Sequence, residues 1–233
     1  MIGAITVAMT LMAFMHTPFK RQEVTVLQFS HRVGNKPLQL FDEVYTNRFN
    51  EPFTVTKFRY YISPISITNA EHRKIILPHR YYLINEADSS SKRIELPYKG
   101  TIEAITLLLG VDSLQNVNGV HSGSLDPVNG MYWTWNSGYV FAKLEGQSDS
   151  SHAPAHGFTW DVGGFRKKEN ALRLIQLELP PSAANTITIK ADLLAWFDAV
   201  HPLRITQSPI CHQPGALATQ LADNYSAMFS IAP

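Results

Sequence analysis

The chain has 233 residues, of which 45% are hydrophobic and 17% are charged, and its formal net charge at pH 7 is +1. A chain of this length can bury one large hydrophobic core, which favours a single main domain. The almost neutral balance, with no basic stripe, argues against binding to nucleic acid.

An apolar segment begins the sequence. It runs from Ile2 to Met15 without a charged residue, is too short to span a bilayer, and has the length of the hydrophobic part of a secretory signal peptide. We therefore expect residues 1–22 to be a signal segment, and the mature chain to be periplasmic or secreted with no membrane span. The basic residues that usually open such a segment are missing, and a buried N-terminal strand is the alternative.

Short segments rich in β-branched and aromatic residues follow, separated by Gly, Pro and Asn. The first is 24–31, in which Thr25, Leu27, Phe29 and His31 share a face. Others are predicted at 38–40, 53–62, 65–67, 81–84, 93–96, 102–110, 172–179 and 186–196, with one short helix at 216–228. The pattern predicts an all-β domain, an antiparallel β-sandwich with long loops, over residues 23–200. Residues 201–233 are then a helical or irregular extension packed on the same domain.

A polar loop, 112–129, leads into the segment with the densest aromatic content, Gly130–Tyr139. There, Trp133 and Trp135 alternate with polar residues at the period of a strand, which predicts that both indoles project from one face. Such a pair either walls the core or lines a surface that faces a ligand. His121 lies in the loop just upstream and could reach the same surface, although a loop histidine is more often merely solvated.

Cys211 is the only cysteine, so no intramolecular disulfide can form. With His212 beside it, its thiol could bind a soft metal, although a lone cysteine is more often unengaged. The sequence contains no phosphate-binding loop, nucleophile elbow or zinc-protease helix. We therefore expect a binding protein, not an enzyme, although carboxylates from distant segments could still meet as a glycosidase pair.

Several segments together resemble a known family. They are Phe29-Ser30-His31, Phe58-Arg59-Tyr60-Tyr61-Ile62-Ser63, Gly110-Val111-Asp112 and, above all, the block that runs from Gly123 through Trp133 and Trp135 to Lys143-Leu144-Glu145-Gly146. The order of residues is similar to that of the MbnP-like family of bacterial periplasmic proteins, in the variant common in Bacteroidetes. The resemblance covers roughly residues 24–196.

The resemblance implies an exported β-sandwich that binds copper. In some members the ligands are histidines and a tryptophan that a di-haem cytochrome c peroxidase of the MbnH type has oxidised to kynurenine. For this chain we expect the metal ligands to be among His31, His121 and Asp161, and the oxidised residue to be Trp133 or Trp135. Members commonly carry His where this chain has Asp161, and a carboxylate is a poorer ligand for Cu(I). Asp161 and His31 could instead bind a harder divalent ion or form a buried hydrogen-bonded pair.

A hypothesis of a different class is a non-metal interaction module. In it, the 112–129 loop and the aromatic strand recognise a protein or a glycan. The two hypotheses differ in what they require of the structure. A metal site needs at least two of the possible ligands to converge near a tryptophan, and these are His31, His121, Asp161, Cys211 and His212.

Overall fold

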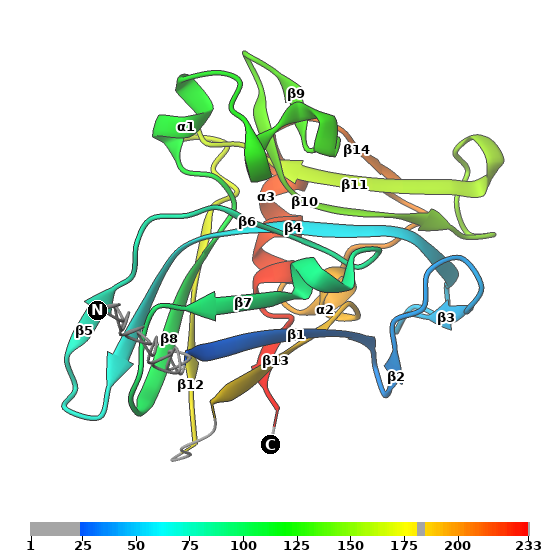
Figure 1. Ribbon diagram of the computed structural model, residues 1–233. Coiled ribbons are helices and arrows are strands. Elements are labelled where there is room, and N and C mark those ends of the chain that lie inside the picture. Colours follow the sequence, from blue (N-terminus) through cyan, green and yellow to red (C-terminus); the bar gives the residue numbers. More distant parts are fainter. Residues whose placement is uncertain (1–23, 181–184, 233) are drawn as a thin grey trace, which may run out of the picture.

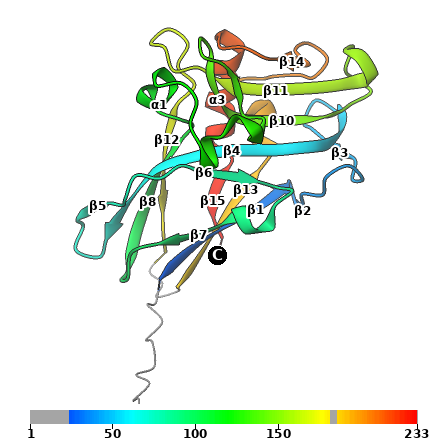
Figure 2. The ribbon, with the colours of Figure 1, turned by 45° about the horizontal axis from the view of Figure 1, so that its top comes forward.

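The computed structural model describes residues 24–180 and 185–232, so the predicted signal segment lies outside the described residues. Two β-sheets pack face to face, and Figures 1 and 2 show the smaller one below the larger. Over the described ranges, no helix is long and apolar enough to cross a membrane.

The small sheet contains the first and the last strands of the described chain. Its members are β1 (Thr25–Val33), β2 (Lys36–Pro37), β7 (Arg93–Leu96), β13 (Thr186–Asp192) and β15 (Phe229–Ile231). The order is β15-β13-β1-β2, and β7 pairs with the start of β1. β1 and β13 run parallel, in register from Val26↔Thr186 to Arg32↔Asp192.

The large sheet is built around one long central strand, β4. Its members are β3 (Tyr45–Thr46), β4 (Pro52–Asn69), β5 (Lys74–Ile76), β6 (Tyr82–Asn85), β8 (Ile102–Leu109), β9 (Tyr132–Thr134), β10 (Gly138–Gln147), β11 (Gly157–Gly163), β12 (Arg173–Glu178) and β14 (Ile210–Cys211). The main order is β12-β8-β4-β10-β11-β14, while β3, β5 and β6 pair with β4 and β9 pairs with β10. β14 runs parallel to β11, and the other pairs of this sheet are antiparallel.

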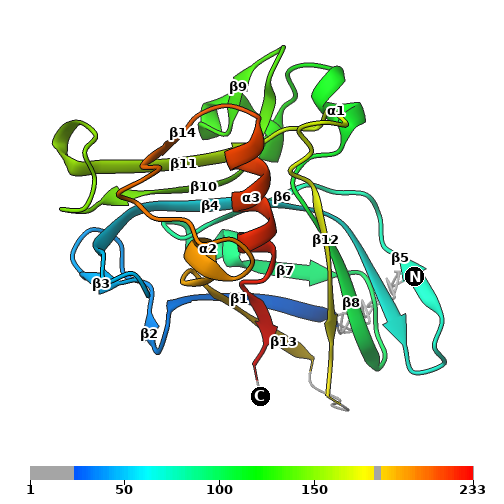
Figure 3. The same ribbon diagram turned by 180° about the vertical axis from the view of Figure 1, so that it is seen from behind.

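Helices are short and lie outside the sheets. They are α1 (Ser113–Val117), α2 (Ala195–Asp198), α3 (Ala216–Ser226) and the 3-10 turns η1 (Ser89–Lys92), η2 (Gly123–Leu125), η3 (Pro127–Asn129) and η4 (Pro154–His156). α3 crosses the back of the molecule and packs against both β11 and β12 (Figure 3). Because three strands separate β11 from β12 in the sheet order, the large sheet must curl toward α3.

Aromatic side chains fill the space between the sheets and α3. The indoles of Trp160 and Trp196 stack with their centroids 6.3 Å apart, and Trp196 stacks in turn on Tyr225 of α3 at 5.0 Å. All three are fully buried. The helix of the C-terminal extension therefore completes the core that the strands begin.

The all-β sandwich is confirmed, and so are most of the predicted strands, although the two parallel pairs were not predicted. Four elements differ from their predictions. The segments 53–62 and 65–67 form one strand that continues through Pro64. The pairing of β4 with β8 is irregular at Pro64, so the N–H that proline lacks is not needed for a hydrogen bond between these strands. The predicted strand 38–40 does not form, and the short strand β2 lies just before it. The predicted strand 186–196 ends at Asp192, and residues 195–198 form α2. The 112–129 loop contains three short helical turns.

Candidate functional site

His31 lies in the core between the two sheets. Its Nδ1 is 2.5 Å from Oε2 of Glu86, and its Nε2 is 2.9 Å from the hydroxyl of Tyr60. Burial lowers the pKa of His31, and this outweighs the effect of Glu86, which raises it. A neutral ring fits these contacts, with Nδ1 donating to Glu86 and Nε2 accepting from Tyr60. Neither nitrogen is then free to bind a metal.

His121 is held in the loop that precedes the aromatic segment. Its Nε2 is 3.1 Å from the carbonyl oxygen of Gln115, and its ring stacks on Tyr139 with a centroid distance of 6.4 Å. The backbone N–H of His121 donates to the Tyr139 hydroxyl at 3.3 Å. These contacts anchor the loop to the start of β10, so His121 has a structural role that needs no metal.

The register of the large sheet separates His31 from Asp161. Phe58, Leu144 and Trp160 lie side by side across β4, β10 and β11, and all three are buried. The His31 ring packs on this row, 4.9 Å from Phe58. Asp161 follows Trp160 in β11, so its side chain points to the opposite face of the sheet. The predicted pairing of His31 with Asp161 therefore does not form.

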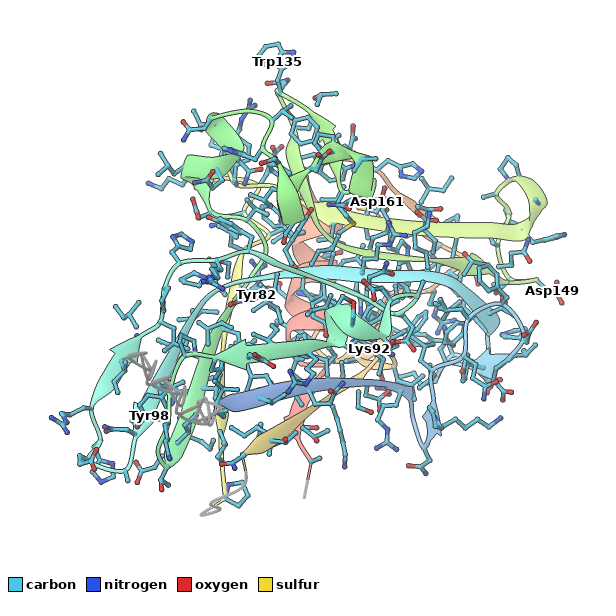
Figure 4. All side chains as sticks on the ribbon, viewed as in Figure 1. Tyr82, Lys92, Tyr98, Trp135, Asp149 and Asp161 are labelled. Carbon is cyan, nitrogen blue, oxygen red and sulfur yellow. The ribbon has the colours of Figure 1, made fainter. Side chains whose placement is uncertain are left out.

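Asp161 belongs instead to a row of charges on the outer face of the large sheet. Lys143 of β10 pairs with Asp161 of β11. Its Nζ lies 2.8 Å from the Asp161 carboxylate and 2.9 Å from Oε1 of Glu145. Nζ of Lys57 lies 2.8 Å from the other oxygen of Glu145. We call these four residues, Lys57, Glu145, Lys143 and Asp161, the charge row. Figure 4 shows Asp161 on the side of the large sheet away from β1.

The parallel strand β14 brings a histidine to the end of this row. Cys211 pairs with Trp160, and the next residue, His212, has its Nδ1 3.7 Å from Oδ2 of Asp161. The other carboxylate oxygen, Oδ1, is buried and accepts no hydrogen bond within the part of the chain that the structure describes. The Asp161 carboxylate therefore lies between the Lys143 ammonium, 2.8 Å from Oδ1, and the His212 imidazole, on the side of Oδ2.

Trp133 covers the same face of β11 that carries Asp161, two residues further along the strand. A Cβ added to Gly163 would come 2.8 Å from Cζ3 of Trp133, which shows that the indole covers this glycine. Gly163 is two residues beyond Asp161 in β11, so the two share a face. The Nε1 of Trp133 is buried and has no hydrogen-bond partner among the described residues. Trp133, Asp161 and His212 together form the candidate site.

Trp135 has a different environment, so the prediction that both indoles share a strand face is wrong. β9 ends at Thr134, and Trp135 lies in the following turn with 81% of its surface exposed. Figure 4 shows it at the tip of the molecule. The signal for this turn is Asn136-Ser137-Gly138, in which Gly138 has a φ of 77°.

Cys211 is a buried residue of β14 and is not activated. Its Sγ lies 3.9 Å from the carbonyl oxygen of Gln213. Burial, and then the negative charge of Asp161, raise the pKa of this thiol to about 11. Cys211 is therefore protonated at neutral pH, whereas a soft ligand for Cu(I) would be the thiolate.

The described residues contain no group of three or more His, Cys, Asp and Glu side chains arranged to hold a metal ion. Asp161 and His212 do meet beside a tryptophan, which is the minimum that the sequence analysis required. His212 was among the possible ligands, but its place beside Asp161 was not predicted, and Lys143 was not considered. The alternation Lys143-Leu144-Glu145 was the available signal for the charge row, although no strand was predicted there.

Comparison with known proteins identifies the family. A family model described as MbnP matches residues 21–213. The chain belongs to the MbnP family. This match includes every strand of the two sheets except β15, and it ends before α3. The structure of MbnP from Methylosinus trichosporium is similar, with a TM-score of 0.51 over 83% of this chain and 81% of that chain. The two sequences are 12% identical, so this likeness shows the MbnP fold alone. No curated protein matches the chain.

Proposed function

We propose that this MbnP-family protein binds copper for acquisition or handling in the periplasm or outside the cell, without catalysing a reaction. The proposed ligands are Asp161 and His212, beneath the indole of Trp133. The observation that carries the proposal is the buried carboxylate of Asp161, whose Oδ2 lies 3.7 Å from Nδ1 of the His212 imidazole. Oδ1 of the same carboxylate accepts no hydrogen bond within the described residues and has the Lys143 ammonium 2.8 Å away, so a bound metal ion would take the place of that ammonium.

The donor atoms favour Cu(II) over Cu(I). Carboxylate oxygen and imidazole nitrogen suit Cu(II), whereas Cu(I) prefers thiolate or thioether sulfur. The Cys211 thiol is protonated because of its raised pKa. Two protein donors leave positions on the ion open, and open positions allow a carrier to take up copper from one partner and release it to another.

The family resemblance extends the proposal to oxidation of Trp133 by a di-haem cytochrome c peroxidase. Two molecules of hydrogen peroxide would insert two oxygen atoms across the C2–C3 bond of the indole, giving N-formylkynurenine and two waters. Hydrolysis then releases formate and leaves kynurenine, whose amine and carbonyl are further N and O donors. Trp133 is preferred over Trp135 because it lies beside Asp161 and its Nε1 has no partner in the described structure.

Copper titration tests the proposal. We expect the metal-free protein to bind near one equivalent of Cu(II), followed by calorimetry and electron paramagnetic resonance, and to bind Cu(I) more weakly under reducing conditions. Asp161→Asn and His212→Ala should each weaken binding, whereas His121→Ala, on a different loop, is the matched control. Affinity weaker than about micromolar, roughly 8 kcal/mol, or equal binding by all variants, would refute the copper function.

Intact mass after co-expression with the peroxidase, with Trp133→Phe as control, tests the oxidation.

A second function, an interaction module, is favoured by one separate observation. Of eleven large hydrophobic side chains that are exposed in the described chain, five lie between residues 114 and 135: Leu114, Val117, Val120, Val128 and Trp135. Exposed apolar residues that gather at one end of a protein are typical of an interaction surface. The double variant Val128→Ser, Trp135→Ser should keep copper binding and lose co-elution with the peroxidase or binding to a glycan array. Unchanged behaviour in both assays would count against this role.

A further inference from the structure

We propose that Lys143 is a tethered competitor for the metal. Its ammonium occupies the cation position at Asp161, moves onto Glu145 alone when a metal ion binds, and thereby limits the site to the most strongly bound divalent ions. This inference rests on the proposed metal site at Asp161 and His212. It assigns a role in affinity and selectivity to a residue that is not itself a ligand.

The position of Lys143 is fixed by its strand. β10 has β4 on one side and β11 on the other, so its backbone is paired along both edges near this residue. The Lys143 side chain is 9% exposed, as is that of Asp161. Nζ donates to Oδ2 of Asp161 and lies equally close, at 2.8 Å, to Oδ1. A cation that approaches both carboxylate oxygens must therefore displace this ammonium.

The charge row provides a second partner for the displaced ammonium. Nζ of Lys143 is already 2.9 Å from Oε1 of Glu145, so a small side-chain rotation keeps one ion pair intact. Lys57 neutralises the same carboxylate from the other side, and its side chain is 39% exposed. Because Lys57 can turn toward water, Glu145 can accept a closer approach of Lys143. Displacement from Asp161 therefore leaves no buried charge without a partner, which would be the larger cost.

A competitor of this kind has different consequences for metal ions that bind weakly and for metal ions that bind strongly. Every incoming cation loses the same free energy in displacing the ammonium, together with repulsion from a positive charge a few ångströms away. Ions that bind N and O donors weakly, such as Mg²⁺ or Mn²⁺, then no longer bind at useful concentrations. Cu²⁺, at the top of the stability order for such donors, still binds. Lys143 would thus set an affinity threshold that Cu²⁺ passes and weakly bound ions do not.

The test is Lys143→Met, which removes the ammonium and keeps the length of the side chain. A hydrogen bond to a charged group is worth roughly 1.5–3 kcal/mol, so loss of the competitor should tighten Cu²⁺ binding by about 10-fold to 100-fold. Zn²⁺ and Mn²⁺, added alone, should gain affinity by a similar factor, so that ions too weakly bound by the wild type bind measurably to the variant. Lys57→Met is the matched control, because Lys57 contacts Glu145 and not Asp161, and it should change the affinity less than about threefold.

The outcomes separate this inference from the copper function itself. If the wild type binds Cu²⁺ and Lys143→Met binds it no more tightly, the competitor role is refuted while the copper function stands. If the wild type does not bind and Lys143→Met does, Lys143 is a competitor but the wild-type protein is not a copper carrier. Should Lys143→Met fail to fold, Lys143→Gln keeps donors to both carboxylates without the positive charge. Lys143→Gln must then bind Cu²⁺ more tightly than the wild type by the same factor, and an unchanged affinity for Cu²⁺ overturns the proposal.

Discussion

The buried His31 makes the stability of the protein depend on pH in a predictable direction. Its pKa in the folded state is lowered from 6.5, chiefly by burial. Below pH 6.5 the unfolded chain therefore takes up a proton that the folded protein does not accept, and the folded state loses stability as the pH falls. A histidine stabilised by an ion pair would instead make the folded state more stable as the pH falls. His31 has the opposite effect, even though Glu86 lies 2.5 Å away.

The size of the effect follows from one proton. If His31 stays neutral in the folded protein between pH 7 and pH 5, the free energy of unfolding falls by at most about 1.9 kcal/mol over that range, from a limiting slope of about 1.4 kcal/mol per pH unit. The pKa of Glu86 is also lowered, from 4.5, by His31 and Lys92 against the effect of its burial. The stability that Glu86 contributes is present above its unfolded value and is lost at more acidic pH, mostly outside this range.

Urea unfolding at pH 7, 6 and 5 measures this loss. His31→Gln is the control, since an amide can still hydrogen-bond to Glu86 and Tyr60 but does not titrate. We expect the difference in unfolding free energy between pH 7 and pH 5 to be smaller in the variant by up to about 1.9 kcal/mol. Equal pH dependence in the two proteins would refute a neutral, buried His31. A wild type that gains stability relative to the variant at pH 5 would show that the pKa is raised.

Two further predictions concern the outer half of the large sheet. Gly146→Ala would place Cβ 1.9 Å from the carbonyl oxygen of Thr54, so we expect a loss of about 3 kcal/mol or more in thermal or urea unfolding. Gly157→Ala, with its nearest contact at 3.4 Å, should cost far less, and similar losses in both variants would contradict the close packing of β10 on β4. For Cys211, the raised pKa and burial predict slow reaction with a thiol reagent at pH 8 in the folded protein and fast reaction in urea. Rapid labelling of the native protein would show an exposed or activated thiol.

The strands could be predicted because their signal is local. Alternation in 24–31 placed Leu27, Phe29 and His31 on one face, and the structure buries all three. The same rule was wrong for Trp135, because the turn at 135–137 interrupts a strand of only three residues. Alternation with a period of two cannot show where a short strand ends when the residues of the following turn continue the same alternation of apolar and polar side chains.

The site could not be predicted in full because it depends on pairing between distant strands. Asp161 and Trp133 were expected from the family pattern, but their neighbours follow from register. Lys143 faces Asp161 only because β10 and β11 pair with that alignment, and a shift of one residue would turn it to the core. His212 reaches Asp161 through a parallel strand of two residues, β14, which has no recognisable pattern of its own.

The parallel pairing of β1 with β13 also has a consequence for how the chain folds. The first strand of the described chain, β1, pairs with β13, which begins at Thr186, and β13 pairs in turn with β15. The pairing of β1 with β13 can therefore form only after these distant residues have been synthesised. Contacts between residues so far apart in sequence are slow to form, because closing the loop costs entropy before any contact repays it. During synthesis, β1 therefore lacks its main neighbour until residues 186–192 have left the ribosome. A chain cut before residue 186 would leave the hydrophobic face of β1, with Leu27 and Phe29, without the strand that lies along it in the complete protein.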